Sequence, residues 1–269
     1  MPDQEGIIRM TELHYDDDAA EQLLALYETH DVVQQRWDFL RALGPRPDER
    51  VLDVGSGPGF LTYAIAEAVG ASGTVDGIDI SDPLLAVART QCARQSWVNF
   101  HHASATQLPF DDHTFDAAIS TQVLEYVSEV DAALAEIHRV VRPAGRVVIV
   151  DTDWDSIVWH SPNRERMKRV LEAWEEHAAY PRLPRTMASR LHSAGFCVHS
   201  QRVVPLFNHC YDPDTYSNRV IDLIVPFVSG RKGISDTEAM AWARELREAG
   251  KRGEYFFSLN RYLFLAKRE

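Results

Sequence analysis

The feature that most constrains this chain is a regular alternation of short apolar runs and helical stretches between Arg50 and Asp151. The apolar runs predict β-strands at 51–54, 74–80, 98–101, 115–120 and 145–151, and the stretches between them predict helices at 59–69, 83–94 and 130–141. Strands that alternate with helices form βαβ units, in which a parallel sheet is covered on both faces. We therefore expect an α/β fold with a doubly wound sheet.

The flanking segments are less regular. Residues 11–43 have helical spacing and end at the turn Gly44-Pro45-Arg46-Pro47. After Asp151 the pattern predicts mostly helix up to residue 195, with helices at 164–177 and 186–194, and then strands at 196–204 and 254–266. The intervening 211–252, with a helix at 236–249, is too long for a plain connection and predicts a lid. We divide the chain into an N-terminal helical cap (1–46), a core (47–210), a lid insertion (211–252) and a final core strand (253–269), and we see no second domain with its own core.

Composition excludes several classes of partner. The 269 residues carry 28 basic and 40 acidic side chains, a net charge of -12, which disfavours a nucleic acid as partner because such binding depends on Lys and Arg. Three cysteines without a C-x-x-C pair predict neither a disulfide framework nor a zinc site. No signal peptide is visible, and the longest apolar runs are too short to span a bilayer. We expect a cytoplasmic protein with no membrane insertion and no bound metal.

A glycine turn follows the first strand of the alternation. Gly55, Gly57 and Gly59 separate the strand from a helix, so a ligand can approach the backbone and its N–H groups closely. A dinucleotide fingerprint starting at Gly55 requires glycine at position 60, which is Phe60 here. Asp53, at the end of the strand, suits organising the turn or facing a cationic ligand, and it opposes a pyrophosphate.

A second acid, Asp79, ends the second strand 20 residues beyond Gly59. A carboxylate at this position can accept both hydroxyl protons of a ribose. The alternative is that Asp79 only caps the helix that begins near Ser81.

With these motifs together, residues 51–150 resemble a class I S-adenosylmethionine (SAM)-dependent methyltransferase, of the small-molecule group that includes the ubiquinone and menaquinone biosynthesis methyltransferases. The resemblance lies in five stretches that occur in the family's order: Val51–Gly59, Gly77–Ser81, Leu108–Asp116, Val123–Val127 and Glu136–Arg146. It implies a Rossmann-like sheet of seven strands, the last one antiparallel and inserted between the fifth and the sixth. It also implies SAM as cofactor and S-adenosylhomocysteine (SAH) as product.

The resemblance assigns cofactor contacts position by position. Asp53 and the loop residues Gly55, Ser56, Gly57 and Gly59 would hold the methionine moiety, Asp79 would bind the ribose and Ile80 would pack on the adenine. The family has an acid followed by a small residue at the adenine amino group, where this chain has Ser104 and Ala105, so only the backbone contact of Ala105 transfers. Thr121 and Gln122 would line the methionine end. The family often has His where Tyr126 stands, and any role of that His does not transfer.

Residues for the methyl acceptor should lie outside these motifs. Asp153 and Trp154 follow the fifth strand, where an acid and an aromatic ring suit a cation, a hydroxyl or a ring, and His160 is a candidate base. The alternative is that the acids cap helices and that Trp154 and His160 are structural.

Further candidates surround the expected site. His209 and Tyr211 follow the sixth strand and could roof the acceptor pocket, Arg36 is assigned to the cofactor carboxylate, and Tyr15 to the substrate side. The alternative for Arg36 is a pair with a surface acid. The apolar residues of 211–252 predict either a lid over an apolar pocket or a homodimer interface.

The preferred function is therefore methyl transfer from SAM to O, N or C of a small, partly apolar molecule by in-line displacement. The alternatives are an NAD(P)-dependent enzyme, a non-catalytic adenosyl-ligand binding protein, and a methyltransferase that acts on a protein or nucleic acid.

Overall fold

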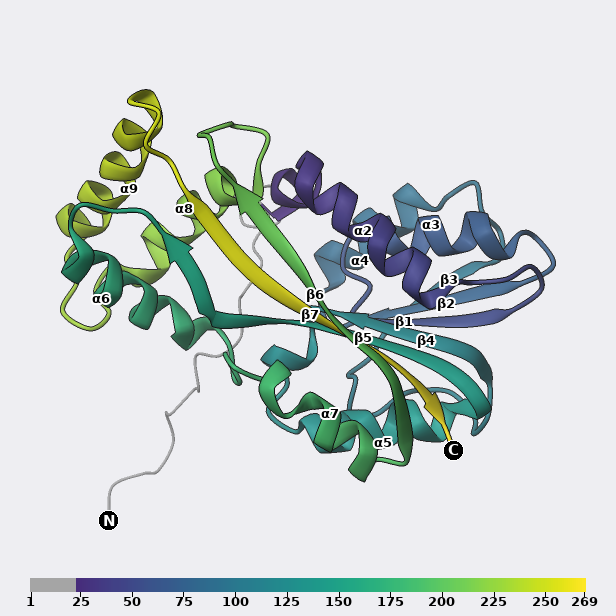
Figure 1. The fold of residues 1–269 in the computed structure, drawn as a ribbon. Coiled ribbons are helices and arrows are strands. Elements are labelled where there is room, and N and C mark those ends of the chain that lie inside the picture. The colour runs from purple at the N-terminus through teal and green to yellow at the C-terminus, as the bar shows by residue number, and fades with distance from the viewer. Residues whose placement is uncertain (1–22) are drawn as a thin grey trace, which may run out of the picture.

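The computed structural model describes residues 23–269, and a seven-stranded sheet runs through the centre of this part of the chain (Figure 1). The first elements are α2 (His30–Leu43), β1 (Arg50–Val54), α3 (Phe60–Val69), β2 (Thr74–Asp79), α4 (Asp82–Gln91), β3 (Val98–His102), β4 (Phe115–Thr121), the 3-10 helix η1 (Leu124–Tyr126) and α5 (Val130–Val140). The remaining elements are β5 (Val141–Trp159), α6 (Arg164–Trp174), the 3-10 helix η2 (Glu175–His177), α7 (Pro184–Ser193), β6 (Phe196–Asn208), α8 (Tyr216–Val228), α9 (Asp236–Lys251) and β7 (Phe257–Arg268). Tyr15 lies outside the described residues.

The strand order is β3-β2-β1-β4-β5-β7-β6. Strands β1 to β5 pair with one another in parallel, whereas β7 is antiparallel to both of its neighbours, β5 and β6. This confirms the doubly wound α/β sheet and the antiparallel last strand between the fifth and the sixth. The carboxyl ends of β1, β2 and β4 therefore meet at one edge, where open α/β sheets bind ligands.

Helices cover both faces of the sheet (Figure 1). α2, α3 and α4 lie on one face, where Phe39 and Ile65 belong to one buried cluster with Val150 of β5. α5 and α7 lie on the other, where Leu134 and Met187 are buried in a second cluster. Among the described residues, no helix is long and apolar enough to cross a membrane.

The expectation that the fifth strand ends at Asp151 is wrong, because β5 continues to Trp159. A register shift lies between Asp153 and Val158, beyond which Trp159 pairs with Phe257 of β7. The acids of this segment resemble a loop in the sequence, but a strand tolerates Asp153 because Arg185 of α7 neutralises it at 2.8 Å. β6 also runs past its expected end, to Asn208.

α6, α8 and α9 pack on the extended ends of β5, β6 and β7, and we call these parts together the helical subdomain (Figure 1). Its core contains the buried rings of Trp159 and Trp242, whose centroids lie 5.4 Å apart, and Ile221 and Ile224 of α8. The sequence did not reveal this buried cluster because its members come from separated segments of the chain.

One carboxylate joins α2 to the helical subdomain. Asp31, in the first turn of α2, accepts hydrogen bonds from the Tyr216 N–H at 3.0 and 3.1 Å and from Nδ2 of Asn208 at 2.9 Å. Tyr216 is the first residue of α8, so a negative charge stands at the positive end of that helix. α2 and α8 are therefore held together at their N-terminal ends.

Candidate active site

The glycine turn after β1 has the backbone that its sequence requires. Gly55, Gly57 and Gly59 have φ angles of 72°, 52° and 83°, in the left-handed region. A Cβ at Gly55 would stand 2.1 Å from Cγ2 of Val123, so this position also needs the missing side chain. A Cβ at Gly57 would meet no atom within 4 Å, so the chain leaves open space in front of this residue.

Asp53, at the end of β1, is a buried acid that organises the turn. Its Oδ2 accepts a hydrogen bond from Oγ1 of Thr62 in α3 at 2.6 Å. Burial raises the pKa of Asp53 to about 7, and the negative charge of Asp79 acts in the same direction. A positive charge brought close to Asp53 would stabilise its ionised form.

Asp79, at the end of β2, joins two turns. Its Oδ2 accepts from the Gly57 N–H and its Oδ1 from the Ser81 N–H, both at 2.9 Å. Burial raises the pKa of Asp79, and these hydrogen bonds oppose the rise. Ser81, whose Oγ accepts from the Leu84 N–H, is itself the N-cap of α4. Asp79 therefore supports both the glycine turn and the start of α4.

A cavity of about 60 Å³ lies over the glycine turn. It brings together six residues that the sequence assigned to the cofactor: Arg36, Gly55, Ser56, Gly57, Thr121 and Gln122. Sequence reasoning missed its other walls, which are Tyr27, Val32, Phe39, Pro58, Phe60 and Leu61. We call this cavity the glycine-loop pocket.

Arg36 belongs to the pocket rather than to a surface ion pair. Its Nη2 donates to the Tyr27 carbonyl at 2.6 Å, and its guanidinium carbon lies 4.7 Å from the centroid of the Phe60 ring. Burial lowers the pKa of Arg36. The positive charge of Arg36 therefore lies beside the N-terminus of α3, the helix that follows the glycine turn.

The residues assigned to adenine lie outside the lining of the glycine-loop pocket. Ile80 follows Asp79 and is 64% exposed, so its side chain is free to pack on a ligand. Ser104 bonds Oγ1 of Thr106 at 2.8 Å, and Ala105 is buried. Both follow β3, which pairs with β2, so all three sit at the same edge of the sheet. Their role with adenine stays a prediction.

Two buried acids lie between β4 and β5. Glu125 is completely buried, and its carboxylate accepts from the Thr152 N–H at 2.5 Å and from Nε1 of Trp154 at 3.2 Å. Asp151 accepts from the Glu125 N–H at 3.3 Å. Burial raises the pKa of Glu125 to about 7, and burial together with the charge of Glu125 raises the pKa of Asp151. These acids fix the loop that follows Gln122.

Arg261 of β7 is a buried cation close to these acids. It is completely buried, and its Nη1 donates to Oε1 of Gln35 in α2. Its charge lowers the pKa of Glu125 and of Tyr27, while burial raises the pKa of Tyr27 to about 12. The Tyr27 ring therefore lies within electrostatic reach of Arg261, Glu125 and Asp79. Of Tyr27, Glu125 and Arg261, only Glu125 belongs to a stretch that the sequence analysis singled out, Val123–Val127.

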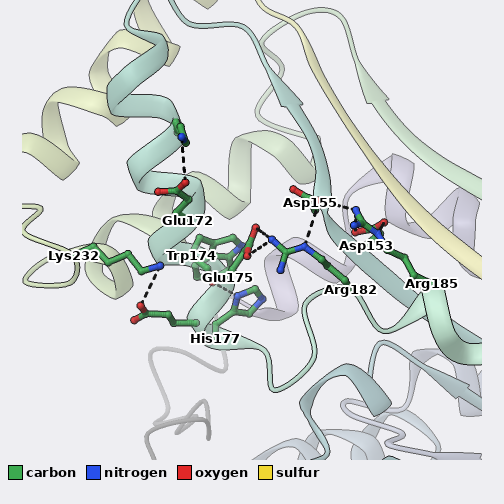
Figure 2. A network of polar contacts seen from close by, with 11 residues as sticks. Asp153, Asp155, Glu172, Trp174, Glu175, His177, Arg182, Arg185 and Lys232 are labelled. Carbon is green, nitrogen blue, oxygen red and sulfur yellow. Dashed lines mark hydrogen bonds and ion pairs between the residues drawn. The ribbon is translucent and has the colours of Figure 1, made fainter.

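The acceptor candidates are not among the residues that line the glycine-loop pocket. Asp153 is bound to Arg185 in a chain of ion pairs that continues through Asp155 and Arg182 to Glu175 (Figure 2). Trp154 and His160 line a second, larger cavity beside α6. His209 stacks on Phe207 with ring centroids 5.8 Å apart, and Tyr211 packs on Tyr255 at 5.3 Å. Their roles toward the acceptor stay predictions.

Residues 52–149 match the family model described as a methyltransferase domain, which is the stretch that holds the glycine turn, Asp79 and Gln122. The chain contains a class I methyltransferase domain. A demethylmenaquinone methyltransferase of Staphylococcus aureus is 36% identical over 126 residues, 47% of this chain and 52% of that protein. The chain thus spans about half of the length, or less, of the curated relatives it matches first.

Solved structures share the fold of the methyltransferase domain. A Haemonchus contortus phosphoethanolamine N-methyltransferase 2, in complex with phosphomonomethylethanolamine and SAH, aligns with 97% of this chain and 59% of its own at a TM-score of 0.62 and 18% identity. The 4+2 cyclase SpnF aligns with 88% of this chain and 80% of its own at a TM-score of 0.57 and 21% identity. At these identities the likeness concerns the fold alone.

Proposed function

We propose that the protein transfers the methyl group of SAM to O, N or C of a small, partly apolar organic molecule. The observation that carries the proposal is the glycine-loop pocket, where Arg36, Gly57 and Gln122 converge beside Asp79. The matched methyltransferase domain supports it. The similarity to a demethylmenaquinone methyltransferase favours a small-molecule acceptor.

The residues present fit SAM. Ser56 Oγ is buried without a hydrogen-bond partner in the described chain, as expected of a group that waits for a ligand. Gly57 has open space in front of it. Asp79 accepts from the Gly57 and Ser81 N–H groups, and a carboxylate has lone-pair sites beyond these for a ribose hydroxyl. Arg36 would neutralise the carboxylate of the methionine moiety.

When bound, SAM supplies a methyl group on a positively charged sulfur. Asp79 would hold the ribose, and the loop at Gly57 and Gln122 would orient the methionine end. Val32 and Phe39 of α2 form an apolar wall that would exclude water, which an in-line displacement requires. Trp154 and His160 line a cavity that shares no residue with this pocket, and Asp153 lines neither cavity. Direct contact of these residues with an acceptor at the methyl group would therefore need the two cavities to approach each other.

The test is label transfer from methyl-labelled SAM into fractions of a cell extract, with heat-inactivated protein as a blank and the Asp79→Ala variant as a matched control. The proposal predicts label in a small organic fraction, which the heat-inactivated blank lacks and which Asp79→Ala reduces at subsaturating SAM. Label confined to protein would support the alternative of a protein methyltransferase. Binding of SAM without transfer in several extracts would favour a non-catalytic adenosyl-ligand protein. The fold is also compatible with chemistry other than methyl transfer, since a cyclase shares it.

A further inference from the structure

A cavity of about 820 Å³ lies between the end of β5 and α6, and we call it the α6 cavity. Its size falls within the usual range of small-molecule sites, about 300–1,000 Å³. It is lined by Trp154, Asp155, Ile157, Val158, Trp159, His160, Ser161, Arg164, Met167, Lys168, Leu171, Glu172, Glu175, Arg182 and Phe256. None of these residues lines the glycine-loop pocket, so the α6 cavity is a separate site.

The walls of the α6 cavity are apolar and aromatic. Trp154 and Trp159 are nearly buried and are held by ring contacts, Trp154 on Trp174 at 5.9 Å and Trp159 on Phe257 at 4.7 Å. Val158 is 56% exposed and Phe256 is 41% exposed, which is unusual for large apolar side chains on neighbouring strands. Rigid aromatic walls with exposed apolar groups suit a flat, apolar ligand.

The charges around the cavity select the polar part of that ligand. Every acid in the lining is paired with a cation: Asp155 with Arg185 and Arg182, Glu175 with the same Arg182, and Glu172 with Lys168 (Figure 2). Arg164, at the start of α6, forms no ion pair or hydrogen bond through its side chain in the described part of the protein. Arg164 is therefore the cation of the lining that can pair with an acidic ligand.

We propose that the α6 cavity is a second small-molecule site, which binds a flat, apolar molecule that carries one acidic group. The ring system lies against Trp154, Trp159 and Phe256, and the acid pairs with Arg164. A cationic ligand is disfavoured because the acids of the lining already have partners. Trp154 also donates to Glu125, so the wall of this site touches the loop that follows β4.

The test uses two dyes that differ only in the acid: 8-anilino-1-naphthalenesulfonate and its neutral analogue N-phenyl-1-naphthylamine. Fluorescence titrations are made on the full chain with saturating SAH, which keeps the dyes out of the glycine-loop pocket. We expect one molecule of the sulfonate to bind per chain. Arg164→Ala should weaken the sulfonate about fivefold, the scale of one partly exposed charge pair, and leave the neutral dye unchanged.

Filling variants test the location. Val158→Trp places a ring at the mouth of the α6 cavity on an exposed strand position, where folding is not at risk, and Leu171→Trp fills the cavity from α6. Both should remove most of the binding of either dye. Val203→Trp, at an equally exposed position of β6 outside the cavity, is the matched control and should change nothing. Undiminished binding in Val158→Trp, or no binding by the unaltered protein, overturns the site, and an equal loss of both dyes in Arg164→Ala overturns the acidic ligand.

Discussion

Replacing Asp79 by alanine should weaken the binding of SAH without unfolding the protein. The carboxylate accepts hydrogen bonds from the Gly57 and Ser81 N–H groups, and its remaining lone-pair sites can accept from a ribose hydroxyl. A hydrogen bond to a charged group contributes about 1.5–3 kcal/mol, and water replaces part of it at a partly open site. We therefore expect a loss of about 1–3 kcal/mol, or about 5- to 150-fold in Kd.

Isothermal titration calorimetry with SAH and its 2′-deoxy analogue separates direct contact from loss of the turn. The unaltered protein should prefer SAH, whereas Asp79→Ala should bind both ligands with nearly equal affinity, because the partner of the hydroxyl is gone. Asp82→Ala, which removes an exposed acid three residues further along, is the matched control and should keep both the affinity and the preference. If Asp79→Ala still discriminates between the two ligands as the unaltered protein does, Asp79 does not contact the ribose.

Three further predictions concern the turn and the buried acids. Gly55→Ala should destabilise the fold by several kcal/mol in denaturant unfolding, because its Cβ meets Val123 at 2.1 Å. Gly57→Leu has the backbone strain of a side chain at positive φ but no clash, so it should cost less stability than Gly55→Ala and should lose SAH binding. The reverse order would refute the assignment of the open side of the turn. The affinity for cationic SAM relative to neutral SAH should rise about tenfold from pH 6 to pH 8 as Asp53 ionises near pH 7, and Asp53→Asn should flatten this ratio in calorimetry. Since the folded-state pKa of Glu125 is raised to about 7, the folded protein retains a proton that the unfolded chain releases, so this group lowers stability as pH rises from about 4.5 to 7. The free energy of unfolding of the unaltered protein should therefore decline over that range relative to Glu125→Gln. Parallel pH profiles of the two proteins would contradict a raised pKa of Glu125.

The parts that sequence reasoning predicted are those with a local signal. The glycine spacing and the acids at the ends of two strands located the pocket edge, because turn, strand end and helix start are adjacent in the chain. The alternation of strands and helices predicted the doubly wound sheet for the same reason. Arg36 was a candidate because residues 11–43 have helical spacing and precede the first strand.

The parts that were missed depend on contacts between distant segments. Gln35 and Arg261 are 226 residues apart, and no local sequence pattern predicts the hydrogen bond between them. The extension of β5 was hidden because Asp153 and Asp155 made the segment after Asp151 look like a loop, although both carboxylates pair with Arg185. The Tyr27 wall was missed because its ring reaches the pocket only through the packing of α2.

The hydrogen bonds of Asp31 have a thermodynamic consequence for the two ends of the molecule. Asp31 holds the start of α8, while Val32 and Arg36, on the same helix, line the glycine-loop pocket. A ligand whose binding displaced the start of α8 would therefore also act on the helix that lines the pocket, and linkage requires any such effect to be equal in both directions. Asp31→Asn weakens this connection without touching either ligand, so it should reduce both effects together, and the order in which two ligands bind should matter less in that variant.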